Sequence, residues 1–302
     1  MIDFMKYKKI YFLISAIFLV PGIISLLTWG LRPSIDFIGG TVWELQLPND
    51  EVNTEEVQGQ IVGIIQDNNV EVHDQLINDD NVLQLKLSSV SVETKNAIRT
   101  NIDENVAVSV EEVRFEMVGP SLGEELLFKT LTGVFIATVG ILLYIAWRFK
   151  DRMYGVCAIL AMFHDTLIVL GVFSLLGHFV GVEVDALFVT AVLTILSFSV
   201  HDTIVVYDRI RESIRKYPKL TFVELINKAV GETLVRSVNN SMTIIFMLAA
   251  LLLLGGESIR WFVFALLIGT IAGTYSSTFT AAPLLAFWHE KINKKSNIKN
   301  KK

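Results

Sequence analysis

Two histidine–aspartate pairs lie inside apolar stretches of the sequence, where ionisable side chains are costly. The pairs are His164-Asp165 and His201-Asp202, and a threonine follows each of them. A charged side chain near the centre of a bilayer costs about 2.5–3.5 kcal/mol on insertion scales, and such residues mark ion pathways and proton relays. Carboxyl and imidazole groups at this depth could therefore bind and release protons on a path through the membrane.

An arginine precedes the next apolar stretch and could act together with one of these carboxylates. If consecutive helices run antiparallel, Arg236 lies at a depth similar to that of Asp202. Protonation of the aspartate would break such an ion pair, and loss of the proton would form it again. This cycle is a physically sound proton relay. It can draw on the membrane field, because moving one charge across it is worth about 2.3 kcal/mol per 100 mV.

Each of these residues also has a structural interpretation. A static salt bridge between Asp202 and Arg236 could simply hold two helices together. Asp165 is a weaker candidate for the proton pathway because it has no obvious cation partner in the sequence. His164 and His201 could carry protons or could only hold hydrogen bonds, and residue chemistry does not decide between these roles.

Long apolar runs indicate the helices that must position these residues. About 20 consecutive apolar residues are enough to cross the hydrocarbon core as a helix. The sequence contains six candidate spans: Ile10–Trp29, Leu126–Trp147, Tyr154–Leu176, Ala186–Tyr207, Val238–Leu254 and Trp261–Trp288. With a hydrophobic fraction of 52%, this pattern predicts a polytopic α-helical membrane protein of six transmembrane helices and argues against a soluble helical protein.

The charges are divided unevenly along the chain, and the division predicts its orientation. Residues 31–125 contain five Lys and Arg against nineteen Asp and Glu, whereas the rest of the chain has an excess of basic residues. Basic segments stay in the cytoplasm, and here they are the N-terminus, the connection after the second span, residues 208–235 and the tail. With six spans, all four fall on one side of the membrane. We therefore expect both termini in the cytoplasm and the acidic segment outside.

These patterns divide the chain into four parts. They are an N-terminus with the first span (1–30), an extracytoplasmic domain (31–125), a five-helix bundle with a basic cytoplasmic loop at 208–235 (126–288), and a basic cytoplasmic tail (289–302). The tail could bind nucleic acid, but beside a membrane it is better explained as an orientation and lipid-surface element. The pattern of His and Cys residues implies no metal and no organic cofactor.

The acidic segment predicts a small α+β domain. Strands are expected at Thr41–Pro48, Val70–Ile77, Val82–Leu87 and Val106–Met117, with helices after Thr54 and at Val92–Glu104. The order βαββαβ is that of a split, ferredoxin-like sandwich. Such a fold says little about chemistry.

A pair of glycines in the last span predicts close helix packing. Gly269 and Gly273 have the GxxxG spacing, and Ser276 and Ser277 follow them. Small residues at this spacing let two helices approach closely. The partner could be a helix of the same chain or of another subunit.

Three segments of the chain resemble the SecF family, the smaller membrane subunit of the bacterial SecD–SecF protein-export complex. The first is Asp36-Phe-Ile-Gly-Gly-Thr41, just outside the first span, and the second is Val118-Gly-Pro-Ser-Leu-Gly-Glu124, which enters the second span. The third is Ser197–Glu212 followed by Glu232–Met242. The likeness covers nearly the whole chain, including the six-span plan and the position of the outer domain.

The resemblance implies a fold related to the proton-driven RND exporters and a partnership with SecD and, through it, with the SecY channel. It implies that the proton-motive force drives late steps of preprotein movement on the outer side. By position, Asp202 and Arg236 match the family's proton-pathway residues, and Asp165 lies in a family-like segment. Five further residues match its structural signature: Asp36, Gly39, Gly40, Gly119 and Pro120.

Three other functions are compatible with this topology. An independent RND-type exporter would usually carry two six-span halves and larger outer domains. An intramembrane aspartyl protease could use Asp165 and Asp202, but the expected Gly-x-Gly-Asp context is absent. A passive assembly factor would not need Asp202 at all. The sequence also lacks HExxH, Walker and GxSxG motifs, so we do not expect an enzyme.

Overall fold

The computed structural model describes residues 3–48, 54–78, 81–149 and 151–299, with side chains up to residue 292. Lys150, Lys301 and Lys302 contribute to the basic segments of the orientation prediction and lie outside the described residues. The chain forms two compact units. One comprises Pro33–Thr132, and the other comprises Met1–Arg32 together with Gly133–Lys302.

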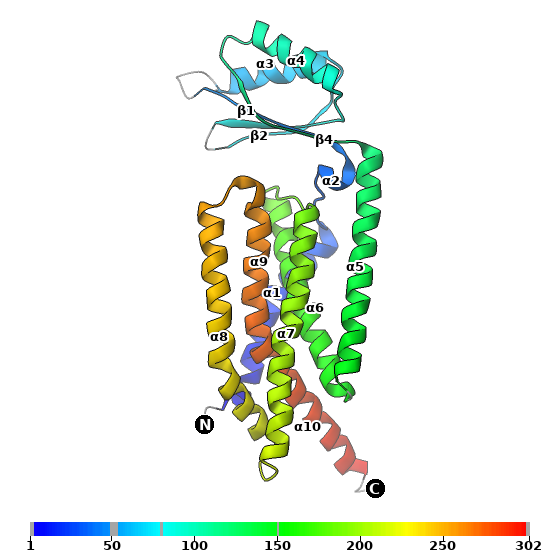
Figure 1. The fold of residues 1–302 in the computed structure, drawn as a ribbon, viewed down its shortest axis with the longest axis vertical. Coiled ribbons are helices and arrows are strands. Elements are labelled where there is room, and N and C mark those ends of the chain that lie inside the picture. Colours follow the sequence, from blue (N-terminus) through cyan, green and yellow to red (C-terminus); the bar gives the residue numbers. More distant parts are fainter. Residues whose placement is uncertain (1–2, 49–53, 79–80, 150, 300–302) are drawn as a thin grey trace. The chain divides into compact units, whose positions relative to one another are not determined.

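The smaller unit is an antiparallel sheet covered by helices. Its elements are α2 (Ile35–Ile38), β1 (Gly40–Gln46), α3 (Thr54–Asp67), β2 (Val72–Ile77), β3 (Val82–Leu87), α4 (Val92–Asn105) and β4 (Glu111–Val118). The strands and long helices follow the βαββαβ order predicted from the sequence, and the strand order in the sheet is β2-β3-β1-β4. Helices α3 and α4 lie side by side on one face of the sheet (Figure 1).

The core of this unit follows from the alternation of apolar residues along its strands. Trp43 and Leu45 of β1 and Leu83 and Leu85 of β3 are fully buried. Successive side chains of a strand point to opposite faces, so these residues share the face that α3 and α4 cover. Ile61 of α3 completes the same cluster, and polar side chains such as Glu44 stay on the other face.

A glycine corner joins α2 to β1 and contacts the start of α5 (Pro120–Arg148). Gly39 has φ 73° and ψ 169°, a backbone region that is essentially restricted to glycine. A Cβ atom at Gly39 would lie 2.7 Å from the Cα atom of Pro120. Gly123 is equally constrained, because its Cβ would lie 2.9 Å from the backbone nitrogen of Gly39. The Gly-Gly and Gly-Pro segments singled out in the sequence therefore pack against each other.

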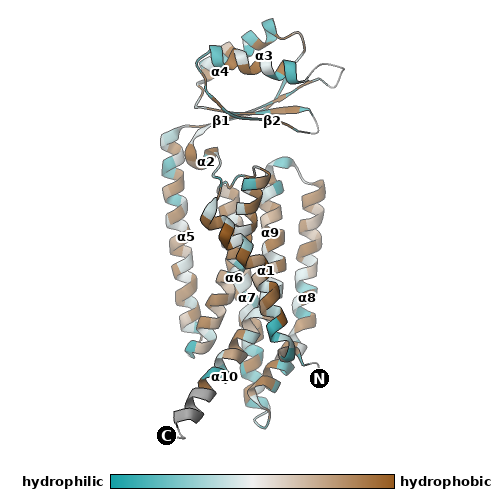
Figure 2. Cartoon of the chain, turned by 180° about the vertical axis from the view of Figure 1, so that it is seen from behind, coloured by the Kyte–Doolittle hydropathy of each residue, from teal (hydrophilic) through white to brown (hydrophobic). Residues whose placement is uncertain are grey.

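The larger unit is a helical bundle. Besides α5 from Gly133 onward, its helices are η1 (Phe4–Tyr7), α1 (Lys8–Thr28), α6 (Arg152–Phe179), α7 (Ala186–Lys216), α8 (Phe222–Leu254), α9 (Glu257–Ser276), the π-helical turn η2 (Ser277–Ala281) and α10 (Ala282–Lys299). Six helical segments are long and apolar enough to cross a membrane, judged by length and composition. They match the six predicted spans in number and order, and Figure 2 shows their predominantly hydrophobic middles.

Two of these helices extend well beyond their predicted apolar spans. Residues 208–235, expected as a loop, are helical except for 217–221, because α7 continues to Lys216 and α8 begins at Phe222. Arg236 is therefore inside α8 and does not open it. The polar extensions are stabilised by a capping box between Thr221 and Glu224 and by the pairing of Glu232 with Arg209 and Lys228. Hydropathy locates the apolar part of a helix but not these polar ends.

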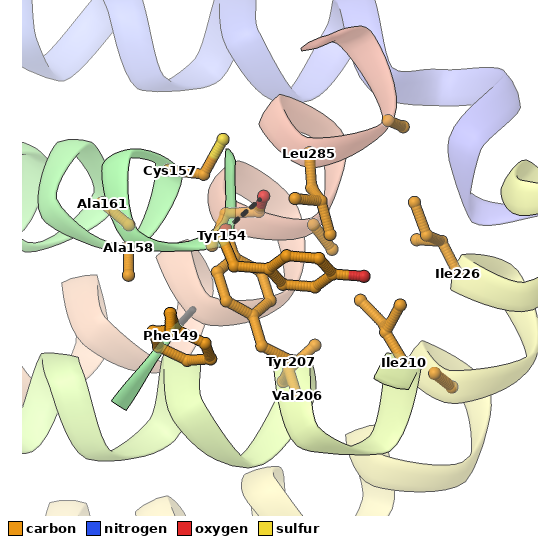
Figure 3. Close-up of a cluster of buried hydrophobic side chains, with 14 of the residues drawn as sticks. Phe149, Tyr154, Cys157, Ala158, Ala161, Val206, Tyr207, Ile210, Ile226 and Leu285 are labelled. Carbon is orange, nitrogen blue, oxygen red and sulfur yellow. Dashed lines mark hydrogen bonds between the residues drawn. The ribbon is translucent and has the colours of Figure 1, made fainter. Parts of the chain in front are cut away.

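The bundle core lies where α6, α7 and α10 meet (Figure 3). Small residues of α6, including Cys157, Ala158 and Ala161, leave room for the fully buried ring of Tyr207 on α7. The Tyr207 hydroxyl donates to the carbonyl oxygen of Ala281 at 2.9 Å, at the end of the π-helical turn. Cys157 is thus a small core residue, as expected from the sequence.

We predict that Gly39→Ala destabilises the protein by about 1–3 kcal/mol or more, because alanine is strained in this backbone region and its Cβ would overlap Pro120. Gly119→Ala is the matched control, since no heavy atom lies within 4 Å of a Cβ at that position. Thermal or denaturant unfolding of the purified protein measures both changes. Equal stability of the two variants would contradict this account of the corner.

Candidate functional site

Asp165 lies fully buried in the middle of the bundle and is held by two other helices. It is at the centre of α6, and its side chain has no exposed surface. The hydroxyls of Ser199 on α7 and Ser276 on α9 both donate to its Oδ2 atom at 2.6 Å. Its Oδ1 atom lies 2.9 Å from Nδ1 of the neighbouring His164. A buried carboxyl group needs such partners, so this cluster joins α6, α7 and α9 at one point.

The close approach of α9 depends on its two GxxxG glycines. A Cβ atom at Gly269 would lie 2.3 Å from the Cδ1 atom of Ile195 on α7. A Cβ atom at Gly273 would lie 3.7 Å from both the Cα atom of Ser199 and the Oδ2 atom of Asp165. The glycines therefore pack against α7 of the same chain, which answers the question that the spacing alone left open.

His164 is nearly as buried as Asp165 and has an unused ring nitrogen. Its Nε2 atom has no hydrogen-bond partner in the part of the chain that the structure describes. Unpaired buried polar atoms are rare and need an explanation. A ring that contacts a carboxyl through Nδ1 and leaves Nε2 open could pass a proton between Asp165 and a second group.

Asp202 lies beside a polar cavity between α7, α8 and α9. The cavity has a volume of about 210 Å³, which exceeds the roughly 30 Å³ that one water molecule occupies in the liquid. Its polar lining residues are Ser199, His201, Asp202, Asn240, Ser241, Thr270 and Thr274. Asp202 is the 17th residue of the 31-residue helix α7, so the cavity reaches the middle of that helix.

The ion pair expected between Asp202 and Arg236 is not formed in this structure. Among the described residues, no ion pair within 4 Å joins Arg236 to a carboxylate. Arg236 points to the exposed side of α8, a helix that buries few of its residues in this chain.

The two aspartates occupy adjacent but different environments. Ser199 donates to Asp165 and also lines the cavity of Asp202, and Gly273 borders both groups. Asp165 is closed, because hydrogen bonds occupy both of its oxygens and it has no exposed surface. Asp202 is half-buried beside a space that can hold water. The position of Asp202 beside this space suits reversible proton binding.

The sequence did not single out the two serines that hold Asp165. Ser199 lies three residues before Asp202 and therefore faces the same side of α7. Ser276 lies three residues after Gly273 and was noted only as a small packing residue. The spacing of each serine along its helix indicated which way its side chain points. Which group its hydroxyl binds depends on how the helices cross, and the sequence does not show this. Among the described residues, no group of three or more His, Cys, Asp or Glu side chains could hold a metal ion.

The family model described as "Protein export membrane protein SecD/SecF, C-terminal" matches residues 98–291. A protein of Thermobaculum terrenum named "Protein translocase subunit SecF" is 41% identical to the chain, over 96% of this chain and 95% of its own length. A Synechocystis protein of the same name is 34% identical over 96% of this chain and 95% of its own length.

Solved structures of SecDF resemble this chain along almost its entire length. The crystal structure of SecDF, a translocon-associated membrane protein from a Thermus species, matches with a TM-score of 0.79 and 31% identity. The match covers 96% of this chain but 39% of that one. A second SecDF crystal structure, in a "super-membrane-facing form", matches with a TM-score of 0.70 and the same identity. The chain thus spans about two fifths of the length of these solved proteins.

We predict that Ser276→Ala lowers the free energy of unfolding by about 1–3 kcal/mol, because it leaves a buried carboxyl oxygen with one hydrogen bond fewer. Ser277→Ala is the matched control. Ser277 is equally buried, but its hydroxyl donates only to the backbone carbonyl of Thr274. Denaturant unfolding of the purified protein compares the two variants, and a loss in Ser277→Ala as large as in Ser276→Ala would refute the role given to Asp165.

Proposed function

Because the chain belongs to the SecF family of protein translocase subunits, we propose that it couples the proton-motive force to late steps of protein translocation. In this proposal it promotes movement and release of the preprotein on the outer side of the cell's inner membrane. Its likeness to the solved SecDF proteins and to relatives named SecF supports SecD as its proposed partner. Through SecD it would act with the SecY channel complex.

The observation that carries the proposal is the position of Asp202. Its carboxyl group lies midway along α7, beside a polar cavity large enough for water. A titratable group at that depth is costly unless it has a function. Water in the cavity can deliver a proton to Asp202 and remove it again, so this residue is the proposed site of proton exchange.

Arg236 is the proposed cation that responds to this exchange. It lies on α8, which borders the Asp202 cavity through Asn240 and Ser241, and it forms no direct ion pair with Asp202. A charged Asp202 attracts the guanidinium group, whereas a protonated Asp202 releases it. A small movement of α8 relative to α7 could therefore follow each proton, which is the kind of two-state change that couples a gradient to mechanical work.

Asp165 and the histidines are proposed to take a secondary part. Asp165 lies behind Ser199, which also borders the Asp202 cavity. The open Nε2 atom of His164 and the cavity position of His201 support a role as proton carriers. We propose that these residues extend the pathway inward from Asp202.

The orientation of the chain remains part of the proposal. The basic helix ends and tail favour a cytoplasmic location for both termini and contact with membrane lipid, and nucleic acid is not an expected partner. The acidic smaller unit is proposed to lie outside the cytoplasm. Its strand order and the two helices on one face support a ferredoxin-like fold for that domain.

We predict that Asp202→Asn abolishes gradient-dependent release of a secreted precursor, because asparagine fills the same space but cannot bind and release a proton. The assay follows precursor release from inverted vesicles with and without a proton gradient, after normal insertion and SecD binding have been verified. Glu212→Gln is the matched control, since it neutralises an exposed carboxylate of the same helix outside the cavity. The control should keep full gradient dependence.

Full gradient dependence in Asp202→Asn would show that this residue is not on the proton path. It would then be explained better as a packing residue of a passive assembly factor. Survival of drug export in cells that lack SecD would instead favour the independent exporter.

A further inference from the structure

A second, larger cavity lies where the polar ends of four helices meet. Its volume is about 710 Å³, within the range of small-molecule sites. It is bordered by the start of α6, the end of α7, the start of α8 and one side of α10. Tyr154 is the third residue of α6, and Phe222 is the first of α8. The cavity is therefore at one end of the membrane-spanning segments, remote along the helices from the Asp202 cavity.

Two arginines give this cavity an excess of positive charge. Arg215 is exposed and has no ion pair or hydrogen bond with any residue that the structure describes. Arg211 reaches Asp208 only at 3.5 Å, and Asp208 is held more closely by Arg148. Asp151 is the one carboxylate among the described lining residues, and its Oδ1 atom already accepts the backbone N–H of Met153 as the cap of α6.

Tyr154 borders the cavity from α6, but its hydroxyl does not face the open space. The residue is 95% buried, and Figure 3 shows the hydroxyl directed toward Ile210 and Ile226 of the apolar core, which do not line the cavity. Tyr154 therefore offers the cavity no hydrogen-bond donor.

The remaining wall is apolar. Ile214, Phe222 and Leu225 contribute side chains from α7 and α8. A site with one unpaired arginine, a second arginine held only by a long ion pair to Asp208, and an apolar wall fits an anion that carries a hydrocarbon part. Arginine forms strong, often bidentate hydrogen bonds with phosphate, and basic pockets between membrane helices bind anionic lipid head groups.

We propose that this cavity binds the phosphate group of an anionic phospholipid of the phosphatidylglycerol class. Arg215 and Arg211 hold the phosphate oxygens. Ile214, Phe222 and Leu225 cover the glycerol and the beginning of the acyl chains. A bound lipid would tie the connection between α7 and α8 to α6 and α10.

The test titrates the purified full chain with phosphatidylglycerol and with phosphatidylcholine and counts bound lipids by native mass spectrometry. We expect binding of phosphatidylglycerol in preference to phosphatidylcholine. The double variant Arg211→Gln/Arg215→Gln should bind it about tenfold or more weakly, since it loses hydrogen bonds to a charged group.

The matched control is the double variant Lys216→Gln/Lys219→Gln. It removes two positive charges from the same helix end and connection, but neither lysine lines the cavity. If it weakens binding as much as the arginine variant does, the attraction is a diffuse surface effect and the proposal is wrong. All variants are first compared by thermal melting, and the single variant Arg215→Gln, which removes an exposed side chain with no ion pair to any described residue, replaces the double variant if that fails to fold.

A further arm adds inorganic phosphate as a competitor. Little displacement of bound phosphatidylglycerol by inorganic phosphate supports a lipid site. Complete displacement of phosphatidylglycerol by inorganic phosphate would assign the cavity to a free phosphate ligand and overturn the proposal. Unchanged binding in the arginine variant would also overturn it.

Discussion

The larger unit depends on one constraint, which is that a carboxyl group buried in an apolar bundle must be supplied with hydrogen bonds. Asp165 meets it with two serine hydroxyls from α7 and α9. Both helices must then approach α6 closely, and Gly269 and Gly273 let α9 pack tightly against α7 at the same point. The π-helical turn begins directly after Ser276, so the change in helix geometry occurs next to this contact. Such turns often occur at functional sites.

The same contact divides the polar interior into a closed part and an open part. Asp165 is enclosed, whereas Asp202 borders a cavity that can hold water. Ser199 belongs to both parts. A proton pathway needs one group that can exchange with water and others that remain protected from it, and this division provides both.

Hydrophobic periodicity predicted the number and order of the spans and the βαββαβ order of the smaller unit, because burial in lipid or in a core leaves a strong sequence pattern. It did not predict that α7 extends to Lys216 or that α8 begins as early as Phe222. Polar interactions, such as the capping box between Thr221 and Glu224, stabilise those helix ends and leave no hydrophobic pattern. Asp165 and Asp202 were identified as candidates because a carboxylate in an apolar stretch is costly in free energy when it enters the membrane. Their different environments, and the distance of Arg236 from Asp202, depend on helix crossings that no local pattern encodes.

The central claim is that Asp202 exchanges protons while the serine-bound Asp165 is protected behind it. Infrared difference spectroscopy of the assembled complex, recorded on stepping the pH, measures the carbonyl stretch of protonated carboxyl groups directly. The account predicts a pH-dependent band that is absent in Asp202→Asn and present in Asp165→Asn. A band that persists in Asp202→Asn and disappears in Asp165→Asn would contradict it.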